Sequence, residues 1–96
     1  MSASSQVRHP YVWRRPGVCG GYPVIRGTRF PVRSVVEYVL RQGMTPEEMV
    51  REWDDLSLAQ IYDALSYYHD HTALIDEDIR RNRRAEAVVR RLATRR

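Results

Sequence analysis

The sequence predicts a mainly α protein, in which a small N-terminal β-hairpin or ribbon precedes a three-helix helix-turn-helix core and a projecting C-terminal helix. Three observations support this fold class. Glycines and prolines crowd residues 16–31, which excludes a helix there. Apolar residues then recur at helical spacing from residue 32 onward. Two helix-start signals, at Thr45 and Ser57, divide that helical region.

The ribbon is predicted from two short extended stretches. Residues 11–15 alternate well enough for a first strand, and Pro16-Gly17 marks a turn after it. The run 23–26 is typical of a short edge strand, because prolines withhold an N–H from a central position. Two strands are rarely stable alone. We therefore expect the ribbon to pack on the helices or to pair with a second copy.

The helices follow in order. The first is predicted over 32–41, and Gly43 is its candidate C-terminal cap. The second begins at Thr45, which is followed by proline and then, three residues after the cap, by Glu48. Ser57 caps the third. From residue 72 the pattern stays helical but polar, so this last helix needs a partner surface.

Charge is strongly segregated along the chain of 96 residues. Residues 1–33 carry a net +6, residues 34–79 a net −9 and residues 80–96 a net +7, which together give +4. Every basic side chain other than histidine is an arginine. We expect a flexible N-terminus over 1–10, a ribbon plus helix-turn-helix domain over 11–71, and a C-terminal partner-binding helix with a basic tail over 72–96. Basic ends of this kind bind phosphates or acidic proteins.

DNA-binding candidates lie in the basic head. They are Arg14, Arg15, Arg26, Arg29 and Arg33, joined by Gln60 on the predicted recognition helix. Glutamine can read adenine, and strands can lie along phosphates. Asp63 on the same helix would repel phosphate, so the neutralising charge must come from the head or the tail. The alternatives are a generic three-helix core, and head arginines that pair with the acidic middle, for example Glu37, Glu47 and Glu48.

Protein-binding candidates lie in the tail, where apolar residues recur at helical spacing among arginines. They are Ile75, Ile79, Arg80, Arg81, Arg83, Arg84, Val88, Val89 and Leu92. Such a helix can bind an acidic groove. The alternative is a solvated, partly disordered tail.

Several classes of function are disfavoured. His69 and His71 point to different faces of a helix, which makes a metal site poor. Cys19 has no companion histidine for nucleophilic catalysis. As the single cysteine of the sequence, it excludes an internal disulfide and indicates a reducing cytoplasm. No apolar run is long enough for a membrane span. We expect no enzyme activity, catalytic residue, metal, cofactor or membrane contact, and a cytoplasmic location.

Three motifs occur in order along the chain. They read Gly20-Gly21-x-Pro23-Val24-Ile25-x-Gly27-Thr28-Arg29-x-Pro31-Val32, then Gly43-Met44-Thr45-Pro46-Glu47-Glu48, then Leu56-Ser57-Leu58-x-x-Ile61-x-x-Ala64-Leu65. Together they resemble the domain-of-unknown-function family 433 over about residues 16–70. The resemblance implies a homeodomain-like helix-turn-helix with a small β element, and the antitoxin half of a type II toxin–antitoxin pair of the VapB kind.

The same resemblance implies partners. The toxin would be a PIN-like ribonuclease covered by the C-terminal segment, and the N-terminal domain would bind operator DNA for autoregulation. Arginines 80, 81, 83 and 84 could neutralise the carboxylates of such an active site. Two alternatives stay open: a stand-alone DNA-binding transcriptional regulator, and an interaction or assembly module that does not bind DNA. A homodimer through ribbon pairing is expected in each case.

Overall fold

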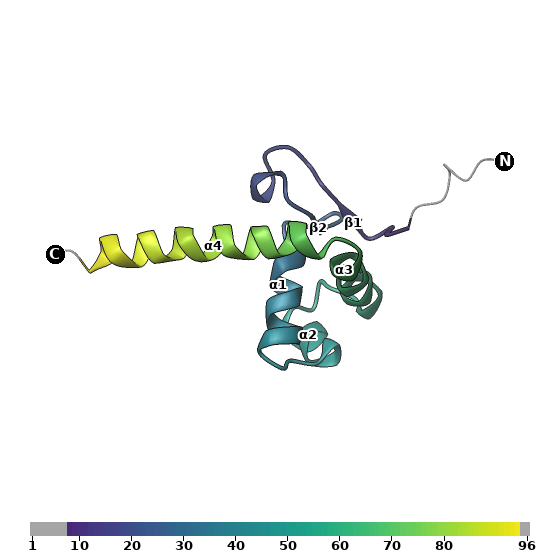
Figure 1. Ribbon diagram of the computed structural model, residues 1–96. Coiled ribbons are helices and arrows are strands. Elements are labelled where there is room, and N and C mark those ends of the chain that lie inside the picture. The colour runs from purple at the N-terminus through teal and green to yellow at the C-terminus, as the bar shows by residue number, and fades with distance from the viewer. Residues whose placement is uncertain (1–7, 95–96) are drawn as a thin grey trace.

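A computed structural model describes residues 8–94. The elements are β1 (Val12–Trp13), a 3-10 turn (Cys19–Gly21), β2 (Val24–Ile25), α1 (Val32–Val36), the π-helical turn η3 (Glu37–Arg41), α2 (Pro46–Glu52), α3 (Leu58–Asp70) and α4 (Thr72–Ala93). Figure 1 shows the two short strands at one end of a helical body from which α4 extends. The predicted class, mainly α with an N-terminal ribbon, is confirmed. Most of the expected flexible N-terminus and the last two residues of the basic tail lie outside the described residues.

The ribbon is short but well anchored. β1 and β2 pair antiparallel, with Val12 opposite Ile25 and Trp13 opposite Val24. The β2 residues are buried in the protein interior, so the strand pair packs on the helices as expected. Of the predicted strand 23–26, only Val24–Ile25 forms β2, and a 3-10 turn occupies Cys19–Gly21 before it.

Local capping signals set the helix boundaries. The Thr45 hydroxyl accepts from the backbone N–H of Glu48, and the Glu48 carboxylate accepts from the backbone N–H of Thr45. Ser57 and Gln60 form the same reciprocal pair at the start of α3. Both predicted N-terminal caps are therefore confirmed. The first predicted helix is continuous over 32–41, but its second half is π-helical, and Gly43 follows it with φ of +79°.

The hydrophobic core is centred on α1, which lies between α3 and α4. Its buried residues come from β2, from all four helices and from the connection before α3, and are Ile25, Val32, Val35, Val36, Met49, Leu56, Ile61, Ala64, Ile75 and Ile79. Aromatic side chains of Phe30, Tyr38 and Trp53 pack around its edge. The first two turns of α4 are thus part of the core.

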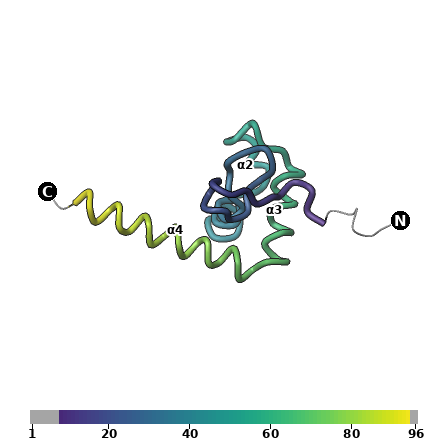
Figure 2. The backbone as a smooth tube through the Cα atoms, turned by 90° about the horizontal axis from the view of Figure 1, so that it is seen from above, coloured from purple at the N-terminus to yellow at the C-terminus, as the bar shows by residue number. Residues whose placement is uncertain are grey.

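The second half of α4 leaves the core. Figure 1 and Figure 2 both show it running past the other helices to the C-terminal end, with no other element beside it. This extension gives the molecule its elongated dimensions of 62 × 29 × 21 Å. The prediction of a projecting C-terminal helix holds for this outer half only. Within residues 8–94, no helix combines the length and the apolar character that a membrane crossing requires.

Candidate partner and nucleic-acid interfaces

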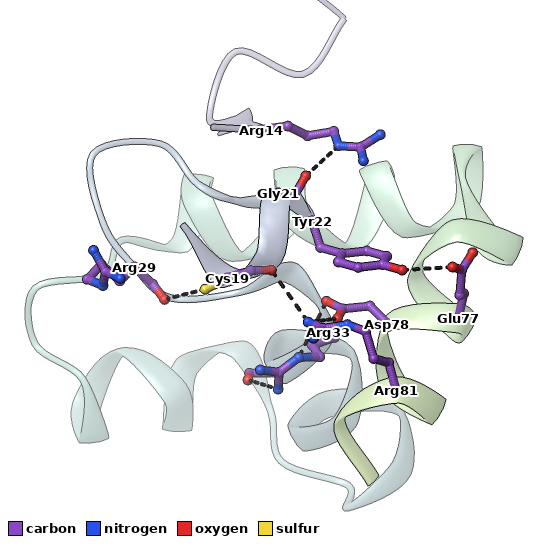
Figure 3. Close-up of polar contacts among 10 residues, drawn as sticks. Arg14, Cys19, Gly21, Tyr22, Arg29, Arg33, Glu77, Asp78 and Arg81 are labelled. Carbon is purple, nitrogen blue, oxygen red and sulfur yellow. Dashed lines mark hydrogen bonds and ion pairs between the residues drawn. The ribbon is translucent and has the colours of Figure 1, made fainter. Parts of the chain in front are cut away.

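A buried carboxylate joins α4 to the rest of the protein. Asp78 is fully buried; its Oδ1 atom accepts from Arg81 Nη2 at 3.0 Å, and its Oδ2 atom lies 3.4 Å from Arg33 Nε. Figure 3 shows the two guanidinium groups converging on this carboxylate from α1 and α4. A buried charge persists when it is paired. Asp78 therefore fixes how α4 sits on α1.

The loop between the strands packs on the same part of α4. The Arg81 guanidinium lies 4.7 Å above the Tyr22 ring, and its Nη2 atom is 3.5 Å from the Cys19 carbonyl oxygen. The Tyr22 hydroxyl donates to the Glu77 carboxylate at 2.7 Å, and this hydrogen bond raises the pKa of the phenol. A Cβ at Gly20, where φ is +68°, would lie 3.2 Å from Arg81 Nη2, so a side chain there would strain the backbone and crowd the Arg81 guanidinium.

These contacts correct two of the sequence predictions. Arg33 was expected to contact DNA, but its side chain is only 17% exposed and is paired with Asp78. Arg81 was expected to contact a toxin, but it is committed to Asp78, Tyr22 and Cys19. Both arginines stabilise the junction between α4, α1 and the ribbon.

The other four head arginines are exposed on the ribbon and its loops. Arg15 and Arg26 lie over the Trp13 ring, 4.8 Å and 5.5 Å from its centroid. Arg14 Nε donates to the Gly21 carbonyl oxygen at 2.8 Å, which holds that side chain along the loop. Across residues 8–94, the ion pairs with carboxylates include none of Arg14, Arg15, Arg26 and Arg29. Their role in DNA binding stays a prediction.

The α3 helix presents little that would attract DNA. The Gln60 side chain, predicted to read adenine, accepts from the Ser57 backbone N–H at 2.8 Å as part of the α3 cap, and its role in DNA binding stays a prediction. The exposed side chains of this helix include Leu58, Ala59, Tyr62 and Ser66. The helix-turn-helix assignment itself stays a prediction.

The carboxylates of the acidic middle pair with groups from all three regions of the chain: His9 and Arg33 in the head, Arg41 in the middle, and Arg81 and Arg83 in the tail. Glu37 accepts from Arg83 at 3.2 Å, and Asp76 lies 3.8 Å from Arg41. Glu48, one of the expected partners for head arginines, caps α2, and hydrogen bonding to the Thr45 backbone lowers the pKa of that carboxyl.

The tail candidates fall into two groups. Ile75 and Ile79 are buried within the chain's own core, so their predicted contact with a partner protein is wrong. The exposed group comprises Arg80, Arg83, Arg84, Val88, Val89 and Leu92, of which the three apolar side chains are 47%, 66% and 60% exposed. This group lies at or beyond the end of the core contacts of α4. The outer half of the helix is thus the surface that a partner can reach.

The sequence did not predict that His9, in the segment before β1, contacts two aspartates of α3. His9 is 8% exposed; its Nε2 atom lies 2.7 Å from Asp70 Oδ2 and its Nδ1 atom 3.2 Å from Asp63 Oδ1. Asp63 also accepts from the Tyr11 backbone N–H at 2.8 Å. The hydrogen bond from His9 lowers the pKa of Asp70. The two aspartates follow His9 by 54 and 61 positions in the chain, and no local sequence pattern predicts contacts over such separations.

A metal centre finds no support in this geometry. Across the described part of the chain, residues 8–94, no group of three or more His, Cys, Asp or Glu side chains is placed to hold a metal ion. The single cysteine, Cys19, donates its S–H to the Arg29 carbonyl oxygen at 3.4 Å.

Comparison with known proteins adds a family. Residues 12–68 match the family described as protein of unknown function (DUF433), a stretch that ends before α4. A crystal structure of a DUF433 member protein from Anabaena variabilis is 35% identical and has a TM-score of 0.67, covering 72% of this chain and 67% of that one. No curated protein matches the sequence. The ribbon, its glycine-rich loop, the capped helix α2 and all but the last two residues of α3 fall in the matched stretch, and the chain belongs to the DUF433 family, whose function is unknown.

Proposed function

We propose that the chain is a cytoplasmic antitoxin of a type II toxin–antitoxin system, which neutralises a PIN-like ribonuclease through the outer half of α4 and binds operator DNA through its ribbon. The observation that carries this proposal is the outer half of α4. It extends beyond the core and exposes arginines and apolar side chains together. A helix of this kind binds grooves that combine apolar surface with acidic groups.

The arginines of this segment gather on one side of the helix. At 100° per residue, positions 80, 83, 84 and 91 project away from the side that carries Val89. Arginine matches carboxylates bidentately and keeps its charge at every physiological pH. A ribonuclease site of the PIN kind is a cluster of carboxylates around Mg²⁺. Arginines projecting from a rigid helix can neutralise such a cluster and block its access to RNA.

Purified full-length protein and the product of the neighbouring gene, which the proposal expects to be a PIN-like ribonuclease, provide the test. We expect a complex and loss of ribonuclease activity. Reversing two charges with Arg84→Glu and Arg91→Glu should weaken the complex roughly 100-fold or more, because charge-assisted hydrogen bonds contribute about 1.5–3 kcal/mol each. Arg51→Glu, an exposed arginine on α2, is the matched control. Equal inhibition by the double variant and the control would refute the role of this face.

The DNA-binding part rests on the ribbon. Arg14, Arg15, Arg26 and Arg29 are exposed, and two of them are held against Trp13. Arginines placed along a strand can follow a phosphate backbone, and each phosphate neutralised adds about 0.9 to the slope of log affinity against log salt concentration for duplex DNA.

Fluorescence anisotropy with a duplex from the chain's own promoter tests this part. We expect steep salt dependence in the wild type, and a slope reduced by about 2 when Arg15→Ala and Arg26→Ala are combined. Arg51→Ala should leave the slope unchanged. A flat salt response in the wild type would favour the second candidate function, a protein-interaction module that does not bind DNA. The apolar side chains Leu58 and Tyr62 on the exposed face of α3 favour that candidate.

A further inference from the structure

One stripe of α4 runs from the core into solvent without a break in its spacing. Positions 75, 78, 82, 85, 89 and 92 alternate steps of three and four residues, the repeat of helices that pack along a seam. Ile75 and Asp78 are buried by the chain's own core and Asn82 is half-buried. Ala85, Val89 and Leu92 continue the same stripe but are exposed. The seam therefore extends past the surface that covers its first half.

Side-chain size along the exposed stripe favours an antiparallel neighbour. Ala85 is the smallest side chain of the exposed stripe, and the shallow, open hollow beside it is bordered by Glu86, Val89 and Arg90. Leu92 is the largest apolar side chain of the stripe and lies two turns further on. A parallel neighbour would set alanine against alanine and leucine against leucine. An antiparallel copy sets Leu92 into the hollow at Ala85, which fills the seam evenly.

The charges on the outer half of α4 are compatible with this pairing. Glu86 and Arg90 lie along one edge of the stripe, and the ion pairs within residues 8–94 include neither of them. Antiparallel pairing places the Glu86 of each copy beside the Arg90 of the other. The remaining arginines, at 80, 83, 84 and 91, project from the far side of the helix, so they do not face one another across the seam.

We propose that a second copy of this chain covers the α4 stripe, defined as Ala85, Val88, Val89 and Leu92, through antiparallel pairing of the two outer halves. Val88 lies at the two-fold axis and meets Val88 of the second copy. Because the stripe spans about 8 residues, or about 12 Å of helix, the association is weak and concentration-dependent. One consequence rests on the proposed function: a partner protein that binds the stripe competes with the second copy for it.

Sedimentation equilibrium of the full-length protein from about 10 µM to about 500 µM, a range suited to a small interface, tests the proposal. We expect a reversible monomer–dimer equilibrium. Val89→Glu should weaken it at least about tenfold, because it buries an unpaired charge in the seam. Arg84→Ala, on the far side of α4, should leave it unchanged. A wild type that stays monomeric, or a Val89→Glu variant that dimerises like the wild type, would overturn the proposal.

Cross-linking on a Cys19→Ser background tests the direction of pairing. Val88→Cys should form a disulfide with its own copy. Ala85→Cys should not cross-link to itself but should cross-link when mixed with Leu92→Cys, since these positions face each other only in the antiparallel pair. Self-cross-linking of Ala85→Cys would instead indicate parallel helices and sink the antiparallel arrangement.

A charge exchange tests the edge of the seam. Glu86→Arg alone and Arg90→Glu alone should each weaken the dimer by about threefold to tenfold, through like charges that face each other twice. The combined variant should restore it. If the combined variant is weaker than either single one, the two side chains do not meet as proposed. None of these measurements includes a partner protein, so their failure would leave the ribonuclease assay as an independent test of the proposed function.

Discussion

Replacing the buried carboxylate at the junction of α4 and α1 should destabilise the protein severely. Asp78→Asn keeps the shape of the side chain and removes its charge, which leaves the Arg33 guanidinium, 17% exposed, facing a neutral amide. Breaking a buried ion pair at one partner costs about 3–5 kcal/mol. The Arg33 contact is 3.4 Å long and is not an aligned hydrogen bond, so we expect about 3 kcal/mol.

That loss is a large fraction of the stability of so small a domain. About 3 kcal/mol corresponds to a melting temperature lowered by roughly 12–24 °C at this size. Urea unfolding followed by circular dichroism gives the free energy directly, and the denaturant dependence should stay unchanged. Asp76→Asn is the matched control, because Asp76 is 31% exposed and 3.8 Å from Arg41 and should cost less than about 1 kcal/mol.

A double variant distinguishes the destabilisation caused by losing the ion pair from that caused by losing side-chain packing. Removing both charges with Asp78→Leu and Arg33→Met leaves only Arg81, which is 42% exposed, without its carboxylate, so the double variant should be more stable than Asp78→Leu alone. The reasoning fails if Asp78→Asn costs no more than Asp76→Asn. It also fails if the effects of Asp78→Leu and Arg33→Met simply add.

Three further perturbations test local features. Ser57→Ala removes the cap of α3 and should cost about 1 kcal/mol in urea unfolding; no loss would mean that the cap contributes nothing. Because His9 lowers the pKa of Asp70, this carboxylate stabilises the fold above the ordinary aspartate value of 3.8, and the contribution disappears as pH falls through the lower folded value. The melting-temperature advantage of the wild type over Asp70→Asn should therefore shrink between about pH 5 and pH 2, and a constant advantage would contradict it. Gly20→Ala should cost more than Gly17→Ala in the same assay, since both have positive φ but only the former places a Cβ 3.2 Å from a guanidinium of α4.

Local sequence signals predicted the helix boundaries well. Thr45 and Ser57 were identified as caps because a capping box lies within four residues of chain and needs no tertiary information. The same locality explains the ribbon, where glycine and proline limit the backbone directly. The π-helical turn Glu37–Arg41 was not predicted, because its apolar spacing is that of an ordinary helix.

Long-range pairing accounts for the errors in the site. Periodicity showed that Ile75 and Ile79 lie on an apolar face, but it does not say whether the chain's own core or another protein covers that face. The partner of Arg33, Asp78, lies 45 residues further along the chain. Local patterns therefore gave no sign of this pair, and Arg33 was predicted to bind DNA. The contacts of His9 with the two aspartates of α3 likewise cannot be predicted from local sequence.

Because α4 is one continuous helix, its length sets the distance between the ribbon and the proposed two-fold axis. The ribbon touches this helix around Glu77 and Arg81, and the proposed two-fold axis lies near Val88, about 9 residues or roughly 14 Å further along. Two ribbons in a pair would then stand about 27–28 Å apart along the helix axis, somewhat less than the ~34 Å of one B-DNA turn. Helix length also sets phase: one residue inserted after Asn82 would rotate the outer half by about 100° and carry its apolar side away from the seam.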